Sequence, residues 1–221
     1  MHSFQLPKNT TVGRVIPKNV FDDNINSRQK KQFTDLVQRI TWTNKLSSQT
    51  TNLRSVDVEE IQIFVIELKK RDTIDEILKI INKHIPYHII CWIEYDEEIF
   101  VSAAHKHKHV TNDDISVIDW IYNSKWFTYE ESPFTINLKD SLDEVLNDFC
   151  AQITGRNDLK GKNASFMIQN QVELDKVNKK ILSIRKQLKK SKQFNEKVEL
   201  NLQLRHLEKS LLALKGKNNE K

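Results

Sequence analysis

The chain is short of glycine, proline and cysteine. Its 221 residues include four glycines, four prolines and two cysteines. The glycines, at positions 13, 155, 161 and 216, are too scattered to form a Walker-type phosphate loop or a dinucleotide-binding fingerprint. The sequence also lacks a serine in a nucleophile elbow and a His-Glu-x-x-His zinc motif. We therefore expect no bound cofactor and none of the enzyme classes that depend on these motifs.

Long apolar runs and paired cysteines are absent as well. No run approaches the length of about 18 apolar residues that a transmembrane helix needs. The first 20 residues lack the apolar core of a signal peptide. Cys91 and Cys150 each lie among apolar residues, which is typical of buried, reduced thiols rather than of a disulfide. These features predict a soluble, cytoplasmic protein without a membrane partner.

Charge is unevenly distributed along the chain. Residues 157–221 contain 16 lysines and arginines against 7 aspartates and glutamates, a net charge of +9. Residues 1–156 contain 19 and 23 of these, a net charge of −4. This asymmetry predicts that the basic C-terminal part meets a polyanion or an acidic protein surface.

The most continuous hydrophobicity lies between residues 59 and 104. The run 61–68 is apolar at six of its eight positions, and 73–85 has apolar residues at helix spacing before Pro86. A second apolar run covers 87–95, and a third covers 99–104 after a turn at Asp96-Glu97. The pattern predicts strand, helix, strand and a hairpin to a further strand. Apolar residues at consecutive positions indicate that both faces of the sheet are covered.

The flanking segments predict further elements. Ser27 can cap a helix over 28–39, and residues 40–46 alternate as a half-buried strand does. The aromatic segment 115–127 and the alternating segment 134–138 predict two more strands. Ser141 with Glu144 forms the pattern of a capping box for a helix over 142–153, which Gly155 ends. We therefore predict an α+β globular domain over residues 1–155, with packed helices on a mixed or antiparallel sheet.

The last part of the chain follows a different pattern. After a linker at 156–164, two stretches have apolar residues spaced alternately three and four apart, which is a heptad seam. Each seam is only about two heptads long, and the polar residues 189–193 lie between them. Residues 165–217 are therefore predicted to form a basic, antiparallel coiled-coil hairpin in which each helix covers the seam of the other. The seam residues are Leu174, Val177, Ile181, Ile184 and Leu188, then Leu200, Leu204, Leu207, Leu211 and Leu214.

Basic residues gather on this hairpin, most of them toward its tip. Such a cluster can contact phosphates or an acidic partner, although Lys-rich flanks are also common on solvated coiled coils. The candidate residues for binding nucleic acid or a partner are Lys179, Lys180, Arg185, Lys186, Lys189, Lys190, Lys192 and Arg205.

One arrangement of acids raises an enzymatic alternative. Restriction-type nucleases hold Mg²⁺ with an acid and the Glu of a Glu-x-Lys motif on neighbouring strands, and the lysine steadies the attacking water or the phosphate. Here Asp57 or Glu59 precedes Glu67 and Lys69, and in a strand these last two point the same way. The motif is common in chains rich in lysine and glutamate, so it stays an alternative to a non-catalytic role.

Three histidines alternate with lysines from His105 to His109. In a strand, His105, His107 and His109 would share one face at a spacing that zinc sites use. No cysteine or acid lies beside them in the sequence to complete a tetrahedral site. We therefore expect an exposed, basic strand end and keep a metal site as the alternative.

Short motifs along nearly the whole chain are similar to those of a known family. Four lie in the first part: Leu6-Pro7-Lys8 with Ile16-Pro17-Lys18, Ile40-Thr41-Trp42 with Leu46, Ile61-Gln62-Ile63-Phe64 through Glu67-Leu68-Lys69, and Ile80 to Tyr87 with its ending Ile85-Pro86-Tyr87. A fifth, Lys192-Gln193-Phe194-Asn195 with Lys197-Val198-Glu199-Leu200-Asn201, resembles the hairpin at the end of many members. On these motifs the chain resembles the domain-of-unknown-function family 4391. The basic run His105–His109 is a departure from the family.

The resemblance implies a bacterial or archaeal protein encoded beside helicases and DNA methyltransferases in restriction or phage-defence loci. It supplies no known catalytic residue. Our hypothesis is a non-catalytic accessory subunit that docks on a helicase (an ATPase) or a DNA methyltransferase, with a hairpin that adds affinity for that partner or for DNA. The alternatives are the Mg²⁺-dependent nuclease and a structural homo-oligomer whose hairpins pair into a four-helix bundle.

Overall fold

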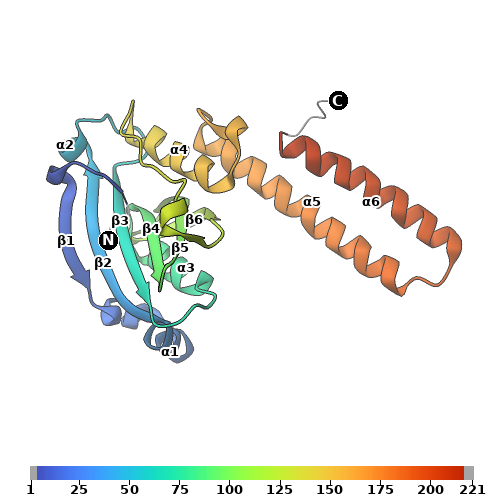
Figure 1. Ribbon diagram of the computed structural model, residues 1–221, viewed down its shortest axis with the longest axis horizontal. Coiled ribbons are helices and arrows are strands. Elements are labelled where there is room, and N and C mark those ends of the chain that lie inside the picture. The colour runs from blue at the N-terminus through green and yellow to red at the C-terminus, as the bar shows by residue number, and fades with distance from the viewer. Residues whose placement is uncertain (1–3, 217–221) are drawn as a thin grey trace. The chain divides into compact units, whose positions relative to one another are not determined.

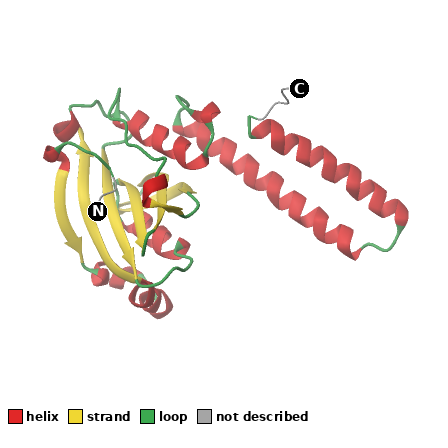
Figure 2. Cartoon of the chain, in the orientation of Figure 1, coloured by secondary structure: helices red, strands yellow, loops and turns green. Residues whose placement is uncertain are grey.

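The computed structural model describes residues 4–216, apart from the side chains at positions 113 and 114. The chain divides into two compact units, Met1–Gly161 and Lys162–Lys221. The first unit holds all the strands of the described residues, and the second is a pair of helices (Figure 2). The protein therefore has the predicted α+β architecture followed by a helix pair.

In the first unit, helices separate the strands as far as β4, and the next three strands then follow one another directly. Its elements are η1 (Lys8–Thr10), β1 (Thr11–Ile16), η2 (Lys18–Asn24), α1 (Ser27–Leu36), β2 (Val37–Ser47), α2 (Ser48–Thr51), β3 (Glu60–Leu68), α3 (Asp75–His84), β4 (His88–Tyr95), β5 (Glu98–His109), β6 (Asn112–Asn123), β7 (Phe127–Thr128), η3 (Tyr129–Glu131), α4 (Leu142–Thr154) and η4 (Asn157–Leu159) (Figure 1).

The strands form one mixed sheet in the order β1-β2-β3-β4-β5-β6, with β7 pairing with β5. Only β3 and β4 run parallel, and α3 connects them. The other neighbouring strands are antiparallel. Some of these pairs are joined by a short turn, such as the one at Asp96 (φ 54°), and others are joined by a longer connection. The apolar runs at 61–68, 87–95 and 99–104 all become strands, as predicted.

Helices cover both faces of the sheet. On one face, α1 and α3 pack with Ile89, Cys91 and Ile93 of β4 in a continuous apolar cluster. The alternate residue Trp92 points to the other face, where its ring contacts Phe4, which also meets Phe149 of α4. Side chains alternate between the two faces along a strand, so β4 is buried on both faces. This explains why its sequence is almost continuously apolar.

The ends of α1 differ from the prediction. Asn26, rather than Ser27, is the N-cap: its side chain accepts from the amide of Gln29, and the Gln29 side chain accepts from the amide of Asn26. The helix ends at Leu36 instead of residue 39, because β2 already begins at Val37, which is fully buried and pairs with Leu68. Pairing with β3 thus overrides the helical spacing of residues 37–39.

The helix α4 begins and ends as predicted. The Ser141 hydroxyl accepts from the amide of Glu144 at 3.2 Å, and Gly155 ends the helix with a φ of 66°. The carboxylate of Asp143 accepts from three successive amides, those of residues 56–58, at 2.9–3.1 Å. An acidic residue in the first turn is favourable to the helix dipole, and here it also holds the loop that leads into β3.

Two predicted strands need correction. Residues 134–138 are not a strand, because the amide and carbonyl of Thr135 bond to the Gln152 side chain instead of to another strand. The segment predicted at 115–127 is instead β6, which starts at Asn112 and ends at Asn123, and the short β7 follows. Alternation alone signals a half-buried surface, and it does not require a strand partner.

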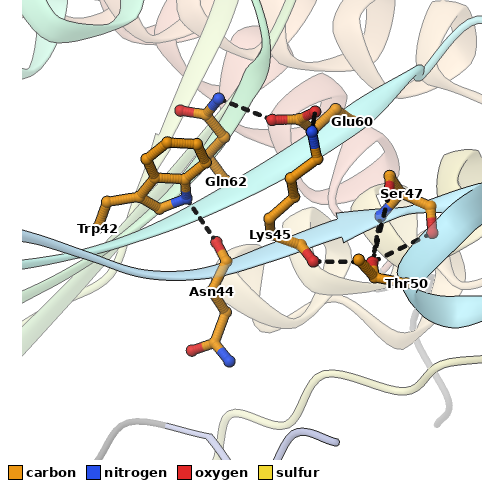
Figure 3. A network of polar contacts seen from close by, with 7 residues as sticks. All are labelled: Trp42, Asn44, Lys45, Ser47, Thr50, Glu60 and Gln62. Atoms are coloured by element: carbon orange, nitrogen blue, oxygen red, sulfur yellow. Dashed lines mark hydrogen bonds and ion pairs between the residues drawn. The ribbon is translucent and has the colours of Figure 1, made fainter. Parts of the chain in front are cut away.

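A polar network fastens the end of β2 to β3 (Figure 3). The buried carboxylate of Glu60 is paired with Lys45 at 2.6 Å and accepts from the Gln62 amide at 2.8 Å. The Thr50 hydroxyl donates to the Lys45 carbonyl at 2.8 Å and so ties α2 back onto β2. Because Glu60 has two partners, its burial does not leave an uncompensated charge.

Both cysteines are free and buried, as predicted. Burial raises the pKa of Cys91 to about 12 and also raises the pKa of Cys150, because a thiolate is poorly solvated in the core. Among the described residues, no helix combines the length and the hydrophobicity needed to cross a membrane.

Candidate binding surface on the helical hairpin

The second unit is built from α5 (Ala164–Lys190) and α6 (Phe194–Leu214), which run side by side (Figure 1). The Asn163 side chain caps the start of α5 by accepting from the amide of Phe166 at 2.9 Å. At the turn, the Ser191 hydroxyl donates to the carboxylate of Glu196 at 2.6 Å. Arg185 of α5 and Glu208 of α6 form an ion pair at 2.9 Å. The helix pair is therefore closed by a short polar turn and one cross-helix ion pair.

The residues of the predicted heptad seam are all buried or of intermediate exposure in this helix pair, so the predicted seam is at most partly enclosed. Leu174, Ile181 and Leu200 are buried. The other seam residues keep intermediate exposure, among them Ile184 and Leu207. Two helices contact each other along a single line, so the apolar groups beside that line remain accessible unless a further element covers them.

A groove lies on one side of the seam. It has a volume of about 550 Å³. Its apolar lining comes from Ile184, Leu202 and Leu207, and Lys180 and His206 line it as well. Ser183 and Gln203 complete the lining, and no carboxylate belongs to it. The lining of the groove is thus largely apolar, and its charged group is a cation.

The helix α6 carries a second apolar stripe outside the seam. Phe194, Val198 and Leu202 recur every four residues and therefore share one face of the helix. Their exposed fractions are 78%, 43% and 61%. Isolated exposed apolar residues are normal on a protein surface, but a row of three on one helix face is typical of an interaction site.

The candidate cations of the hairpin fall into two groups. Lys179 pairs with Asp175 at 2.6 Å, and Arg185 is held by Glu208. The remaining candidates are exposed, and within residues 4–216 none of them has an ion pair with a carboxylate: Lys180, Lys186, Lys189, Lys190, Lys192 and Arg205. Four of these six flank the turn between the helices, so the tip carries a positive charge that neighbouring acids do not neutralise.

The residues of the nuclease alternative are not gathered at one place. Asp57 and Glu59 precede β3, whereas Glu67 lies near its other end, so most of the strand separates them. Glu67 is paired with Arg39 across the β2–β3 ladder, and the Lys69 ammonium donates to the carbonyl of Thr34 at 2.6 Å. Within the described residues, no three histidines, cysteines or acids are grouped so that they could hold a metal ion.

The histidine segment is only partly an exposed strand end. His105 is buried: its Nδ1 lies 3.0 Å from the Tyr122 hydroxyl and its Nε2 lies 2.9 Å from the Asn147 amide oxygen. His107 lies at the surface beside Asp119, and His109 contacts Thr111. The three histidines therefore have separate partners, and the prediction of an exposed basic segment was wrong for its first two residues.

The strand β5 also buries a lysine that the sequence reasoning missed. Lys106 is 5% exposed, and its ammonium donates to the carbonyls of Asn82 and Ile85 at the end of α3, at 2.8 and 2.5 Å. Burial lowers the pKa of Lys106 to about 7 and also lowers that of His105. A cation at a helix C-terminus is favourable to the dipole, so Lys106 has a structural role in the core.

Pockets also lie within the described part of the first unit. One of about 440 Å³ is lined by Phe4, Trp92 and Phe134. Another, of about 500 Å³, contains Arg71, which stacks over the Trp126 ring and pairs with Glu98 at 2.8 Å. The guanidinium is thus satisfied within the protein, whereas Lys180 in the hairpin groove has no ion pair with a carboxylate of residues 4–216.

Comparison with known families finds a match between residues 4–211 and the family model described as Domain of unknown function (DUF4391). The matched range includes the sheet, its helices and most of the hairpin. No curated protein and no solved structure matches the chain.

Proposed function

Since the chain belongs to the DUF4391 family, we propose that it is a non-catalytic accessory subunit that binds a partner protein through its hairpin. The partner that we propose is a helicase (an ATPase) or a DNA methyltransferase of a bacterial restriction or antiviral defence system, acting in the cytoplasm. This assignment to a defence system derives from the resemblance described above.

The exposed apolar stripe on α6 is the observation that carries this proposal. A helix that only paired with α5 would need one apolar face, yet α6 has two. Phe194 is the most exposed of its apolar residues, and burying a phenylalanine contributes roughly 1.5–3 kcal/mol. A partner that covers Phe194, Val198 and Leu202 therefore gains affinity from surface that the protein itself leaves in water.

A second candidate function is contact with DNA through the tip of the hairpin. It is supported by the unpaired lysines at positions 186, 189, 190 and 192, which are positioned to neutralise phosphates. Such contacts would be independent of base sequence, because phosphates carry no sequence information. The two roles are compatible, since the tip and the apolar stripe involve different residues.

The other two alternatives receive less support. A nuclease centre needs its carboxylates around one metal ion, and Glu67 and Lys69 each have another partner instead. A four-helix bundle of two hairpins would bring like charges together, because residues 164–214 contain eleven lysines and arginines and five acids, a net charge of +6.

Co-purification tests the accessory role. The tagged full-length protein is co-expressed with the helicase or methyltransferase encoded beside it, and the complex is measured by size-exclusion chromatography. We expect a stable complex that the double variant Phe194→Glu with Val198→Glu disrupts. The control Gln187→Glu with Asn195→Asp adds the same charge at exposed polar positions of the hairpin. A complex that survives the apolar variant, or no complex at all, contradicts the proposal.

A further inference from the structure

We propose that the groove between α5 and α6 receives an acidic, amphipathic helix of the partner protein, which completes a three-helix arrangement with the hairpin. This inference deepens the proposed function and rests on it, since it specifies the segment of the partner that the hairpin binds.

The first step of the argument is the incomplete seam. Ile184 and Leu207 belong to the two heptad patterns, and in a fully covered coiled coil both would be buried. They remain partly exposed and line the groove together with Leu202. A third apolar surface placed there would remove the exposed part of the seam from water, and the gain is proportional to the area covered.

The shape of the groove favours a helix as its occupant. On α5 the lining residues fall within 180–184, and on α6 they fall within 202–207, so the groove extends along about one to two helical turns on each side. An amphipathic helix presents apolar side chains at positions i, i+3, i+4 and i+7, which is the spacing of the two seams that it would contact. An extended strand would gain no backbone hydrogen bonds from the hairpin, because helices offer no free ladder edge.

Charge decides the character of that helix. Lys180 and His206 lie in the lining, and no carboxylate does. Lys180 has no ion pair with a carboxylate in the described part of the chain, so an acidic residue beside the partner's apolar stripe can pair with it without displacing another contact. A second copy of this hairpin would instead bring its own excess of cations to the groove. The complementary occupant is therefore acidic and comes from another protein.

The test uses the full-length protein and three labelled synthetic peptides of 21 residues. The first has leucines at heptad spacing flanked by glutamates, the second replaces the glutamates with lysines, and the third is a scrambled form of the first. Fluorescence anisotropy measures binding. We expect the acidic peptide to bind at least ten times more tightly than the other two, and its affinity to fall as salt is raised.

Two variants test the location. Ser183→Trp places a large ring in the groove at an exposed position, and Lys180→Glu removes its cation. We expect the first to weaken binding of the acidic peptide at least tenfold, and the second to reverse the preference toward the basic peptide. Lys197→Glu is the matched control, because it makes the same charge change at an exposed lysine of the hairpin outside the groove and should alter affinity less than threefold.

Several results would overturn the inference. They are equal binding of the acidic and basic peptides, full binding by Ser183→Trp, and concentration-dependent dimerisation that Ser183→Trp abolishes, since a second copy would then be the occupant. If the partner complex forms and depends on Phe194 and Val198 while Ser183→Trp leaves it intact, the groove inference fails and the accessory role stands. If no partner complex forms, the accessory role fails.

Discussion

The ammonium of Lys106 lies 2.8 Å from the backbone carbonyl oxygen of Asn82 and caps the last turn of α3 from the neighbouring sheet. The Ser116 hydroxyl of β6 adds a bond to the carbonyl of Pro86, just beyond the helix. Lys106 thus satisfies a carbonyl that the helix end leaves without an intrahelical partner, and Ser116 fixes the segment that follows the helix. These bonds require that the ammonium of Lys106 is buried, and a buried titratable group makes the stability of the protein sensitive to pH.

The stability of the folded protein should rise with pH above neutrality because of Lys106. Burial lowers its pKa from 10.5 to about 7, so between these values the unfolded chain binds more protons than the folded one. By linkage, the free energy of unfolding increases as pH rises through this interval, by at most about 2 kcal/mol between pH 7 and 8.5. Urea denaturation at several pH values measures it.

The control is Lys83→Met, at an exposed lysine of α3, the helix that Lys106 caps, and this variant should keep the pH dependence of the original chain. In Lys106→Met we expect a flatter curve over the same range. The measurement stops at pH 8.5 because of Cys91, whose pKa is raised in the folded protein. At higher pH the unfolded chain loses the proton of this thiol while the folded protein keeps it, and this lowers the free energy of unfolding. An unchanged slope in Lys106→Met would remove this explanation.

The buried hydrogen bonds that link Tyr122, His105 and Asn147 predict that replacing His105 lowers the stability of the protein. Because the Asn147 amide oxygen can only accept, the His105 Nε2 donates to it and Nδ1 accepts from the Tyr122 hydroxyl. His105→Leu leaves two buried groups without partners, and we expect a cost of about 1–3 kcal/mol. His107→Leu, at the surface, should cost less than about 0.5 kcal/mol. If His105→Leu and His107→Leu lower the free energy of unfolding equally in urea denaturation, the buried hydrogen bonds of His105 have no structural role.

The two apolar faces of α6 should respond differently to truncation. Leu200 is buried in the seam, so Leu200→Ala should destabilise the hairpin by roughly 2 kcal/mol or more. Leu202 is 61% exposed, so Leu202→Ala should change stability by less than about 0.5 kcal/mol. Circular dichroism at 222 nm during urea unfolding measures both. If Leu202→Ala is as costly as Leu200→Ala, the outer stripe already has a partner within the chain.

The nuclease alternative makes a direct prediction that we expect to fail. A metal-dependent nuclease cuts DNA only with Mg²⁺ and loses this activity in Lys69→Ala. Since the Lys69 ammonium is bonded to the Thr34 carbonyl, we expect no Mg²⁺-dependent cleavage by the original protein on single-stranded, double-stranded or methylated DNA. If the original protein cuts DNA and Lys69→Ala abolishes the cutting, the protein is a nuclease and not a non-catalytic subunit.

The sequence predicts elements well where one local signal dominates. The runs that become β3 and β4, and the Ser141 and Gly155 ends of α4, are fixed by continuous hydrophobicity or by capping chemistry. It fails where the outcome depends on a distant partner. Alternation at 134–138 cannot reveal that Gln152 will bond the backbone there, and a Lys-His pattern at 105–109 cannot reveal that α3 ends beside Lys106.

The candidate binding surface of the hairpin could be predicted only in part, because it too depends on contacts between residues that are distant in the sequence. Heptad spacing predicts which leucines pair, and the basic residues of the hairpin are evident from composition. The groove and the outer stripe depend on how far two short helices can cover each other. The exposed row Phe194, Val198 and Leu202 could have been found by counting apolar residues outside the seam.

Contact with DNA through the tip predicts a steep dependence on the lysines at positions 186, 189, 190 and 192. Replacing all four with glutamate changes the tip charge by eight units, so affinity for a DNA duplex in a gel shift should fall at least a hundredfold. The salt dependence of binding by the original protein should reveal about three to four phosphate contacts. The matched control Lys8→Glu with Lys83→Glu, Lys125→Glu and Lys139→Glu makes the same charge change at exposed lysines of the first unit. Equal losses in both variants would indicate attraction by net charge alone, and retained binding in the tip variant would exclude the tip as the DNA contact.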